Sequence, residues 1–244
     1  MKKRASMNTH NKKILIIPDV HGRQFWKKAV GSGDYDKVVF LGDYLDPYPD
    51  ERIGELTAQH NFEDILSYYD QHPDKVVLLL GNHDLHYLSP HYHDICPSGR
   101  YNEQHSDYYR FLFTQKDRFR LACEETIGKQ KYLFTHAGVN QYWLKRNKKL
   151  IVAPDAEHLN QLLLTDEGIE TLAQVGIARW GEYLTGSIIW SDCDELALTD
   201  PLPHVYQIVG HTQQFDGTPV ITDHFACLDT RSAFTLSSEG IKAV

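Results

Sequence analysis

Short runs of apolar, mostly β-branched or leucine residues recur along the chain, and most of them end in a polar turn that contains glycine. Runs this short and this uniformly apolar are typical of strands that are buried on both faces of a sheet. They predict strands at residues 14–17, 38–41, 76–80, 132–135 and 205–209. Three further strand-like runs lie near the end of the chain, at residues 220–222, 225–228 and 233–236.

Stretches with helical spacing of apolar residues lie between these strands. They predict helices within residues 55–69, 106–127 and 158–176, the last of them closed by Gly176 as a C-cap. Strands that alternate with helices indicate an α/β (mixed α+β) fold class. The sequence shows no internal repeat or linker, so we expect one domain at residues 14–244 after a flexible basic leader at residues 1–13.

Composition and charge narrow the classes of protein that remain. The 244 residues are 41% hydrophobic and 24% charged, which is an ordinary balance for a globular protein. A net charge of −8 argues against strong general binding to nucleic acid, which needs a basic face. The apolar run at residues 14–17 is shorter than the about 7–15 residues of a secretory signal. We therefore expect a cytoplasmic protein without membrane association, whose four scattered cysteines stay reduced.

Residue types that bind metal ions follow five of the predicted strands. These residues are Asp19 with His21, then Asp43, then Asn82 with His83 and Asp84, then His136, and finally His211. Carboxylate, amide oxygen and imidazole together suit Mn, Fe or Zn. The carboxyl ends of neighbouring strands meet at one crevice in an open α/β sheet. Each motif alone is more typical of a turn, but all five together predict a metal site.

These motifs also carry a resemblance to a known family. The segments Asp19-x-His21, Gly42-Asp43-Tyr44-Leu45-Asp46, Gly81-Asn82-His83-Asp84, His136-Ala137-Gly138 and Gly210-His211-Thr212 resemble the calcineurin-like metallophosphoesterase superfamily. Gly-Asp-Tyr, His-Ala-Gly and Trp190-Ser191-Asp192 are similar to its phosphoprotein phosphatase branch, which includes diadenosine tetraphosphate hydrolases. The resemblance implies a four-layer sandwich, in which two mixed β-sheets are flanked by helices.

The resemblance also implies a role for each residue of the site. Asp43 would bridge two metal ions, with Asp19 and His21 on the first. The second metal would be held by Asn82, His136 and His211, and His83 paired with Asp84 would be the general acid. Elementary chemistry agrees, since two cations lower the pKa of a shared water to about 7 and histidine donates protons near neutral pH. Manganese is the expected metal, with iron or zinc as alternatives.

The sequence departs from the family pattern where arginines are expected to bind the substrate phosphate. Pro47 follows Asp46, and Leu80 precedes Gly81, at positions where protein phosphatases of this type carry arginine. We expect Arg23, and then Arg179, to bind the substrate in their place. Arg100 and Arg231 rank behind them. In addition, Gln213 stands where the nuclease and phosphodiesterase branches carry a second histidine.

The leading hypothesis is therefore a metal-dependent phosphoesterase that acts on a phosphomonoester, either a phosphoprotein or a nucleotide-type substrate. A phosphodiesterase or nuclease, and a dinucleoside polyphosphate hydrolase, remain the alternatives. A scaffold that has lost its metals is disfavoured, because every expected ligand is present.

Residues 85–109 are rich in tyrosine and histidine. This segment either forms a lid over the metals or packs its own aromatic rings on the domain surface.

Overall fold

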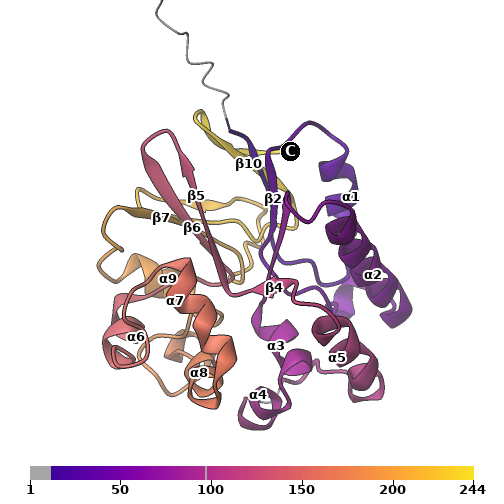
Figure 1. Ribbon diagram of the computed structural model, residues 1–244, viewed down its shortest axis with the longest axis horizontal. Helices are drawn as coiled ribbons and strands as arrows, with labels where there is room; N and C mark the ends of the chain where they lie inside the picture. The colour runs from indigo at the N-terminus through magenta and orange to yellow at the C-terminus, as the bar shows by residue number, and fades with distance from the viewer. Residues whose placement is uncertain (1–11, 97) are drawn as a thin grey trace, which may run out of the picture.

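The computed structural model describes residues 12–96 and 98–244, so most of the expected basic leader at residues 1–13 lies outside the described residues. The strands form two sheets (Figure 1). The first sheet has the order β11-β10-β1-β2-β3-β4, comprising Gly240–Ala243, Phe234–Ser237, Ile14–Ile17, Lys37–Phe40, Val76–Leu79 and Phe119–Arg120. The second has the order β5-β6-β7-β9-β8, comprising Ala122–Ile127, Gln130–Thr135, Val205–Val209, Phe225–Cys227 and Val220–Ile221.

Both sheets are mixed, which confirms the predicted fold class. Strands β1 to β4 run parallel, whereas β10 and β11 pair antiparallel at the edge. In the second sheet β6, β7 and β9 run parallel, and β5 and β8 close the two edges antiparallel. Ile17 pairs with Phe40, and Phe40 with Leu78, so the carboxyl ends of β1, β2 and β3 lie level with one another. The loops that follow these strands therefore emerge at the same edge.

The apolar runs are buried on both faces because each strand packs against two different layers. Ile14 and Ile16 of β1 belong to the cluster between the sheets, together with Phe134 and Ile208. The alternate residues of β1 point to the opposite face and join the cluster under the helices. Successive side chains of a strand point to opposite faces, so a strand between two apolar layers is apolar throughout.

Helices cover the outer faces of the sheets. Along the first sheet lie α1 (Phe25–Val30), α2 (Glu55–Gln71) and α5 (Ser106–Thr114) (Figure 1). At the lower edge of the view are α3 (Asn82–Leu88) and α4 (Pro90–Ile95). Below the second sheet gather α6 (Gln141–Arg146), α7 (Ala156–Asn160), α8 (Asp166–Leu172) and α9 (Cys193–Ala197). Single 3-10 turns occur at Pro49–Glu51, Glu103–His105, Gln161–Leu164 and Ile177–Arg179.

Two of the predicted helices are wrong in part. Within residues 106–127 the helix ends at Thr114, and the rest forms β4 and β5. Strand β5 pairs with β6 through a hairpin at Gly128, whose φ of 62° suits glycine. Within residues 158–176 the chain forms two helices joined by a 3-10 turn, because the Thr165 side chain accepts from the Gly168 N–H and starts a new helix.

The segment at residues 85–109 packs its aromatic rings on one another. Tyr101 stacks on His93 with ring centroids 3.9 Å apart, and on Tyr87 at 4.8 Å. Tyr87 also meets Tyr109 edge to face at 5.1 Å. Of the two alternatives for this segment, these contacts match the self-packing one.

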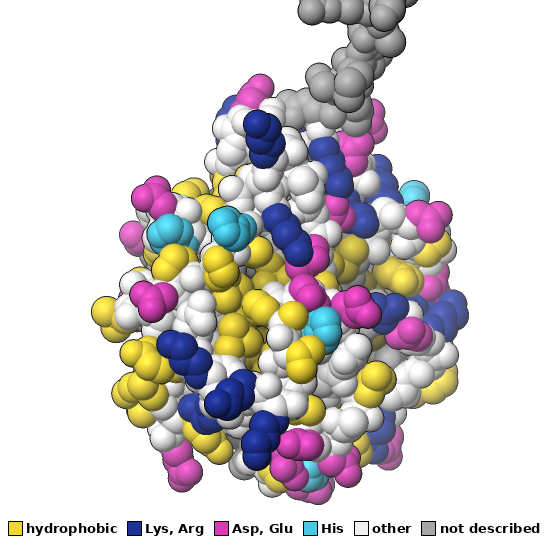
Figure 2. Space-filling view, turned by 60° about the vertical axis from the view of Figure 1, so that its left-hand side comes forward, with side chains coloured by type: hydrophobic (Ala, Val, Ile, Leu, Met, Phe, Trp, Pro, Cys, Tyr) yellow, Lys and Arg dark blue, Asp and Glu magenta, His cyan; other side chains and the backbone are white. Residues whose placement is uncertain are grey.

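Two observations concern the surface of the described chain. None of its helices is both long and apolar enough to span a bilayer. On the face drawn in Figure 2, basic and acidic side chains are interspersed, and this face is not uniformly basic.

Candidate metal centre

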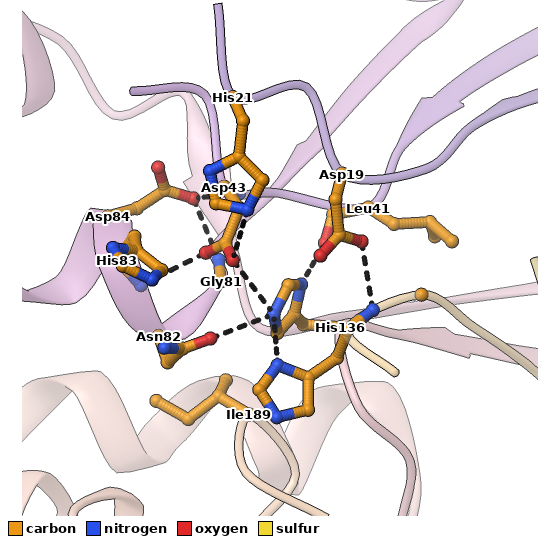
Figure 3. A network of polar contacts seen from close by, with 12 residues as sticks. Asp19, His21, Leu41, Asp43, Gly81, Asn82, His83, Asp84, His136 and Ile189 are labelled. Carbon is orange, nitrogen blue, oxygen red and sulfur yellow. Dashed lines mark hydrogen bonds and ion pairs between the residues drawn. The ribbon is translucent and has the colours of Figure 1, made fainter. Parts of the chain in front are cut away.

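The loops at the ends of five strands bring the predicted ligands together (Figure 3). Two sets of three side chains each have their ligand atoms within 4.8 Å of one another. One set contains Asp19, His21 and Asp43, and the other contains Asp43, His136 and His211. Asp43 belongs to both sets, so its carboxylate could contact one ion held by each set. All five side chains are buried.

The Asp43 carboxylate lies between two imidazole rings (Figure 3). Its Oδ2 atom is 3.4 Å from His21 Nε2 and 3.5 Å from His136 Nε2. His136 Nε2 is also 3.1 Å from Asn82 Oδ1 and 3.1 Å from His211 Nδ1. Asn82 therefore adds an amide oxygen to the second set, as predicted for a metal ligand.

Backbone carbonyl groups fix which ring nitrogen each of two histidines presents. His21 Nδ1 lies 2.9 Å from the Leu45 oxygen, and His136 Nδ1 lies 2.8 Å from the Leu41 oxygen. A carbonyl oxygen only accepts, so each Nδ1 carries the proton and donates. The neutral rings then present the lone pair of Nε2 to Asp43. Such a contact behind a ligating ring is the usual way in which proteins orient a histidine toward a metal.

The donor set fits metal ions on an observation that is independent of the family. In its neutral form, His136 Nε2 is an acceptor, yet it faces a carboxylate oxygen, an amide oxygen and the ring nitrogen of His211. Of these three neighbours only His211 Nδ1 could donate, and buried acceptors with too few donors are costly to fold. A cation among them satisfies all of these lone pairs at once. Nitrogen and oxygen donors in this mixture suit Mn, Fe or Zn.

Electrostatics keep the ligands in the forms that bind cations. Burial lowers the pKa of His21 and of His211 well below the usual value, so both rings are neutral near pH 7. Burial works against ionisation of Asp43, but the surrounding His136, His83 and His21 hold its pKa well below the ordinary range. Neutral imidazole and ionised carboxylate are the forms that coordinate metals.

The backbone at the site adopts conformations that L-residues rarely take. The φ angles of His21, Asp43, Asp46 and His211 are 44°, 52°, 57° and 63°. Left-handed backbone at non-glycine residues clusters at functional sites, where the surrounding structure holds it in place. Gly81 is needed for a different reason, since a Cβ atom there would lie 2.1 Å from Asp43 Oδ1.

The predicted pairing of His83 with Asp84 is wrong, because Asp46 holds the ring. His83 Nδ1 lies 2.8 Å from Asp46 Oδ2, and the Tyr87 hydroxyl donates to the other oxygen of this carboxylate. The Asp84 carboxylate instead accepts from the backbone N–H groups of Gly81, Asp43 and Tyr44 at 2.7–2.9 Å. Asp84 thereby ties the loop after β2 to the loop after β3. Consecutive residues of a helix, such as His83 and Asp84 in α3, do not face each other.

Both arginines that we expected to bind substrate already have carboxylate partners. Arg23 donates through Nε and Nη2 to the two oxygens of Glu51, each at 2.8 Å. Arg179 Nε lies 2.8 Å from Asp192 Oδ2, and its Nη2 donates to the Thr212 hydroxyl at 3.0 Å. Arg179 is close to the His211 loop, where it also donates to the His211 carbonyl oxygen. Substrate binding by either arginine stays a prediction.

Two residues near the centre, Asp46 and Asp229, were given no role from the sequence, and a third, Arg100, ranked only behind Arg23 and Arg179 as a substrate-binding residue. Asp46 lies in the Gly-Asp-Tyr-Leu-Asp motif, and its position beside a strand end was a usable signal. Arg100 contacts His83 from a loop that begins after α4, and no sequence pattern predicts this contact. Asp229 follows β9 and is buried beside Asp19 and Arg23, which the same strand-end rule would have found. Neither of its carboxylate oxygens has a hydrogen-bond partner among the described residues, and burial raises its pKa well above the usual value.

Comparison with known proteins places this centre in a family. The family model described as calcineurin-like phosphoesterase matches residues 12–215, which is most of the chain and includes every predicted ligand. The chain belongs to the calcineurin-like phosphoesterases. Members of this family are metal-dependent, so the chain is a metallophosphoesterase, and its buried centre contains candidate ligands for divalent metal ions.

Two solved structures are similar to this chain. A cold-active protein-tyrosine phosphatase of a psychrophilic Shewanella species is 14% identical, with a TM-score of 0.55 over 96% of this chain and 80% of that one. A protein serine/threonine phosphatase from Saccharomyces cerevisiae is 15% identical, with a TM-score of 0.49 over 94% of this chain and 74% of that one. At these identities the first likeness shows the shared fold alone. No sequence among curated proteins matches the chain.

Proposed function

We propose that this metallophosphoesterase hydrolyses phosphomonoesters at a dinuclear centre that Asp43 bridges. The observation that carries the proposal is the shared position of Asp43, whose carboxylate belongs to both sets of ligand atoms. A bridging ligand must reach two ions and offset their repulsion, and a buried carboxylate with a low pKa does both. Asp19 and His21 would hold one ion, and Asn82, His136 and His211 the other.

The chain's own residues set up the remaining chemistry. When bound, the two metals supply positive charge for the phosphoryl oxygens and a water of lowered pKa. His21 and His136 are held in place by the carbonyl groups of Leu45 and Leu41, which direct their Nε2 atoms toward Asp43. Asp84 fixes the loops of Asp43 and Gly81 against each other through their N–H groups.

His83 is positioned as the general acid for the leaving group. Its ring is 5.2 Å from the His21 ring, and its Nδ1 contacts Asp46, so the Nε2 atom is directed away from that carboxylate. A proton on Nε2 would pass to the alkoxide oxygen as the phosphorus–oxygen bond breaks. The contact with the Asp46 carboxylate keeps the ring oriented.

Several finer assignments belong to this proposal. The observations that favour a monoester over a diester are the substitution of Gln213 for the second histidine of the nuclease-like branches and the negative net charge of the chain. Manganese suits the mixture of oxygen and imidazole donors. The four free cysteines support a reducing compartment such as the cytoplasm.

The test is hydrolysis of p-nitrophenyl phosphate and of its bis-ester by chelator-stripped protein, with Mn²⁺ added back. We expect turnover of the monoester, and we expect Asp43→Asn to lose both activity and one or both metal ions. Metal content by elemental analysis provides the second readout. Preferential turnover of the bis-ester would replace the monoester proposal with the diester alternative, and full activity of Asp43→Asn would refute the bridging role.

A further inference from the structure

A phosphomonoester carries two negative charges, and its enzyme needs positive side chains in addition to the metals. The family's usual arginines are replaced here by Pro47 and Leu80. Arg23 and Arg231 share the Glu51 carboxylate, and Arg179 pairs with Asp192. Each of these arginines is thus held by a carboxylate, which directs attention to an arginine that has no such partner.

Arg100 reaches the centre from the loop between α4 and the 3-10 turn at Glu103–His105. Its Nη2 atom lies 2.7 Å from His83 Nε2, and its Nη1 donates to the Asp46 carbonyl oxygen at 2.6 Å. The guanidinium group lies 4.0 Å above the centre of the Tyr48 ring. His21 meets the same tyrosine ring edge to face, with centroids 4.8 Å apart. Arg100 thus lies beside both the proposed general acid and a proposed metal ligand.

The partners of Arg100 leave its charge available. Within the described residues it forms no ion pair with a carboxylate, unlike Arg23, Arg179 and Arg231. Its contacts are a backbone carbonyl group, the Nε2 atom of His83 and the face of an aromatic ring. Stacking on an aromatic face holds the guanidinium plane while its N–H groups stay free to exchange partners.

We propose that Arg100 binds the phosphate of the phosphomonoester substrate, and that it leaves His83 Nε2 when it does so. This inference rests on the proposed function. An arginine–phosphate contact is charged on both sides and often bidentate, whereas the contact of Arg100 with His83 uses a single N–H group and no anionic acceptor. A phosphoryl oxygen therefore takes Nη2 from His83. The same movement frees His83 Nε2, which then needs a proton from solvent before it can donate one to the leaving group.

The geometry also favours a particular class of ester. A monoester dianion offers three terminal oxygens, of which two can meet the guanidinium fork while the metals hold the remainder. A diester has one terminal oxygen fewer and half the charge. Loss of Arg100 is therefore expected to harm monoester binding more than diester binding.

The experiment compares Arg100→Gln, Arg100→Lys and the control Arg110→Gln in manganese-loaded protein. Arg110 is a suitable control because it pairs with Asp107 on its own helix α5. Calorimetry measures the affinity for inorganic phosphate, and kinetics measure KM for p-nitrophenyl phosphate and its bis-ester. We expect Arg100→Gln to weaken phosphate binding and raise the monoester KM by about 10- to 100-fold. Arg100→Lys, which keeps the charge without the fork, gives an intermediate loss.

Metal content and the melting temperature separate a binding role from a structural one. We expect both to match the wild type in Arg100→Lys, and Arg110→Gln to match the wild type in every readout. Unchanged phosphate affinity in Arg100→Gln, equal losses for monoester and bis-ester, or loss of metal in both Arg100 variants would overturn the inference. If wild-type protein hydrolyses neither ester but binds phosphate through Arg100, the proposed function fails while the phosphate site stands.

Discussion

The contact between His83 and Asp46 can be tested by changing a single atom. In Asp46→Asn the side chain keeps its size and an oxygen that accepts from the Tyr87 hydroxyl. In the wild type, His83 Nδ1 lies 2.8 Å from a carboxylate oxygen of Asp46. In the variant, the amide nitrogen faces His83 Nδ1 instead, and it cannot accept a hydrogen bond. The variant therefore loses the contact that orients the ring and the negative charge beside it.

The magnitude follows from the kind of bond that is lost. His83 and Asp46 are both buried, and a hydrogen bond to a charged group in such a place contributes about 1.5–3 kcal/mol. At about 1.4 kcal/mol for each factor of ten, kcat for an alkyl phosphate falls by about 10- to 150-fold. An aryl phosphate has a leaving group that needs no proton, so its kcat falls much less.

The assay measures kcat for phosphoserine and for p-nitrophenyl phosphate with manganese-loaded protein, alongside metal content. Asp84→Asn is the matched control, because Asp84 is equally buried but contacts backbone N–H groups. We expect Asp84→Asn to lower the melting temperature without separating the two substrates. Equal losses of Asp46→Asn on both substrates, or no loss at all, would refute the assignment of Asp46 to the general acid.

Three further changes probe the acid, the packing at the ligands and the response to pH. His83→Ala should retain both metals but slow alkyl phosphates far more than aryl ones, and equal slowing would remove His83 from the acid role. Gly81→Ala should lower manganese affinity in equilibrium dialysis, because the new Cβ would lie 2.1 Å from Asp43 Oδ1; wild-type affinity would show that the loop yields freely. Burial lowers the pKa of His86 to about 3, so the folded state resists protonation that the unfolded chain accepts below its usual value of 6.5. The free energy of unfolding therefore falls by up to about 1.4 kcal/mol per pH unit as pH drops from about 6.5 to about 3. His86→Leu should flatten this slope in urea titrations, and an unchanged slope would assign the acid sensitivity to other groups.

The sequence was most informative where one physical rule governed both strand and site. Buried parallel strands are uniformly apolar and end at one edge, so the first polar residues after them meet, as Asp19, Asp43 and His136 do. The same rule was not applied to Asp229. Strand β5 was missed because its half-exposed Glu124 and Glu125 interrupt the apolar pattern, and its pairing with β6 decides its conformation.

Side-chain direction and long-range contacts explain what the sequence could not give. The choice between Asp46 and Asp84 as the partner of His83 depends on where the side chains of α3 point. The position of Arg100 depends on the path of a whole segment, 54 residues beyond the Asp46 carbonyl group that it contacts. Neither is encoded in local periodicity, since both result from packing between parts of the chain that are distant in sequence.

The left-handed backbone of the ligand loops has a consequence for engineering. Each non-glycine residue in this conformation costs about 1–2 kcal/mol that glycine would not. The positions of His21, Asp43, Asp46 and His211 are thus places where a screen for heat resistance would find improved variants. Every such variant would lose a ligand or the partner of the acid. Substitutions at these four positions would therefore raise thermostability only by lowering turnover. A search for a more thermostable enzyme is better directed at the helices and outer strands.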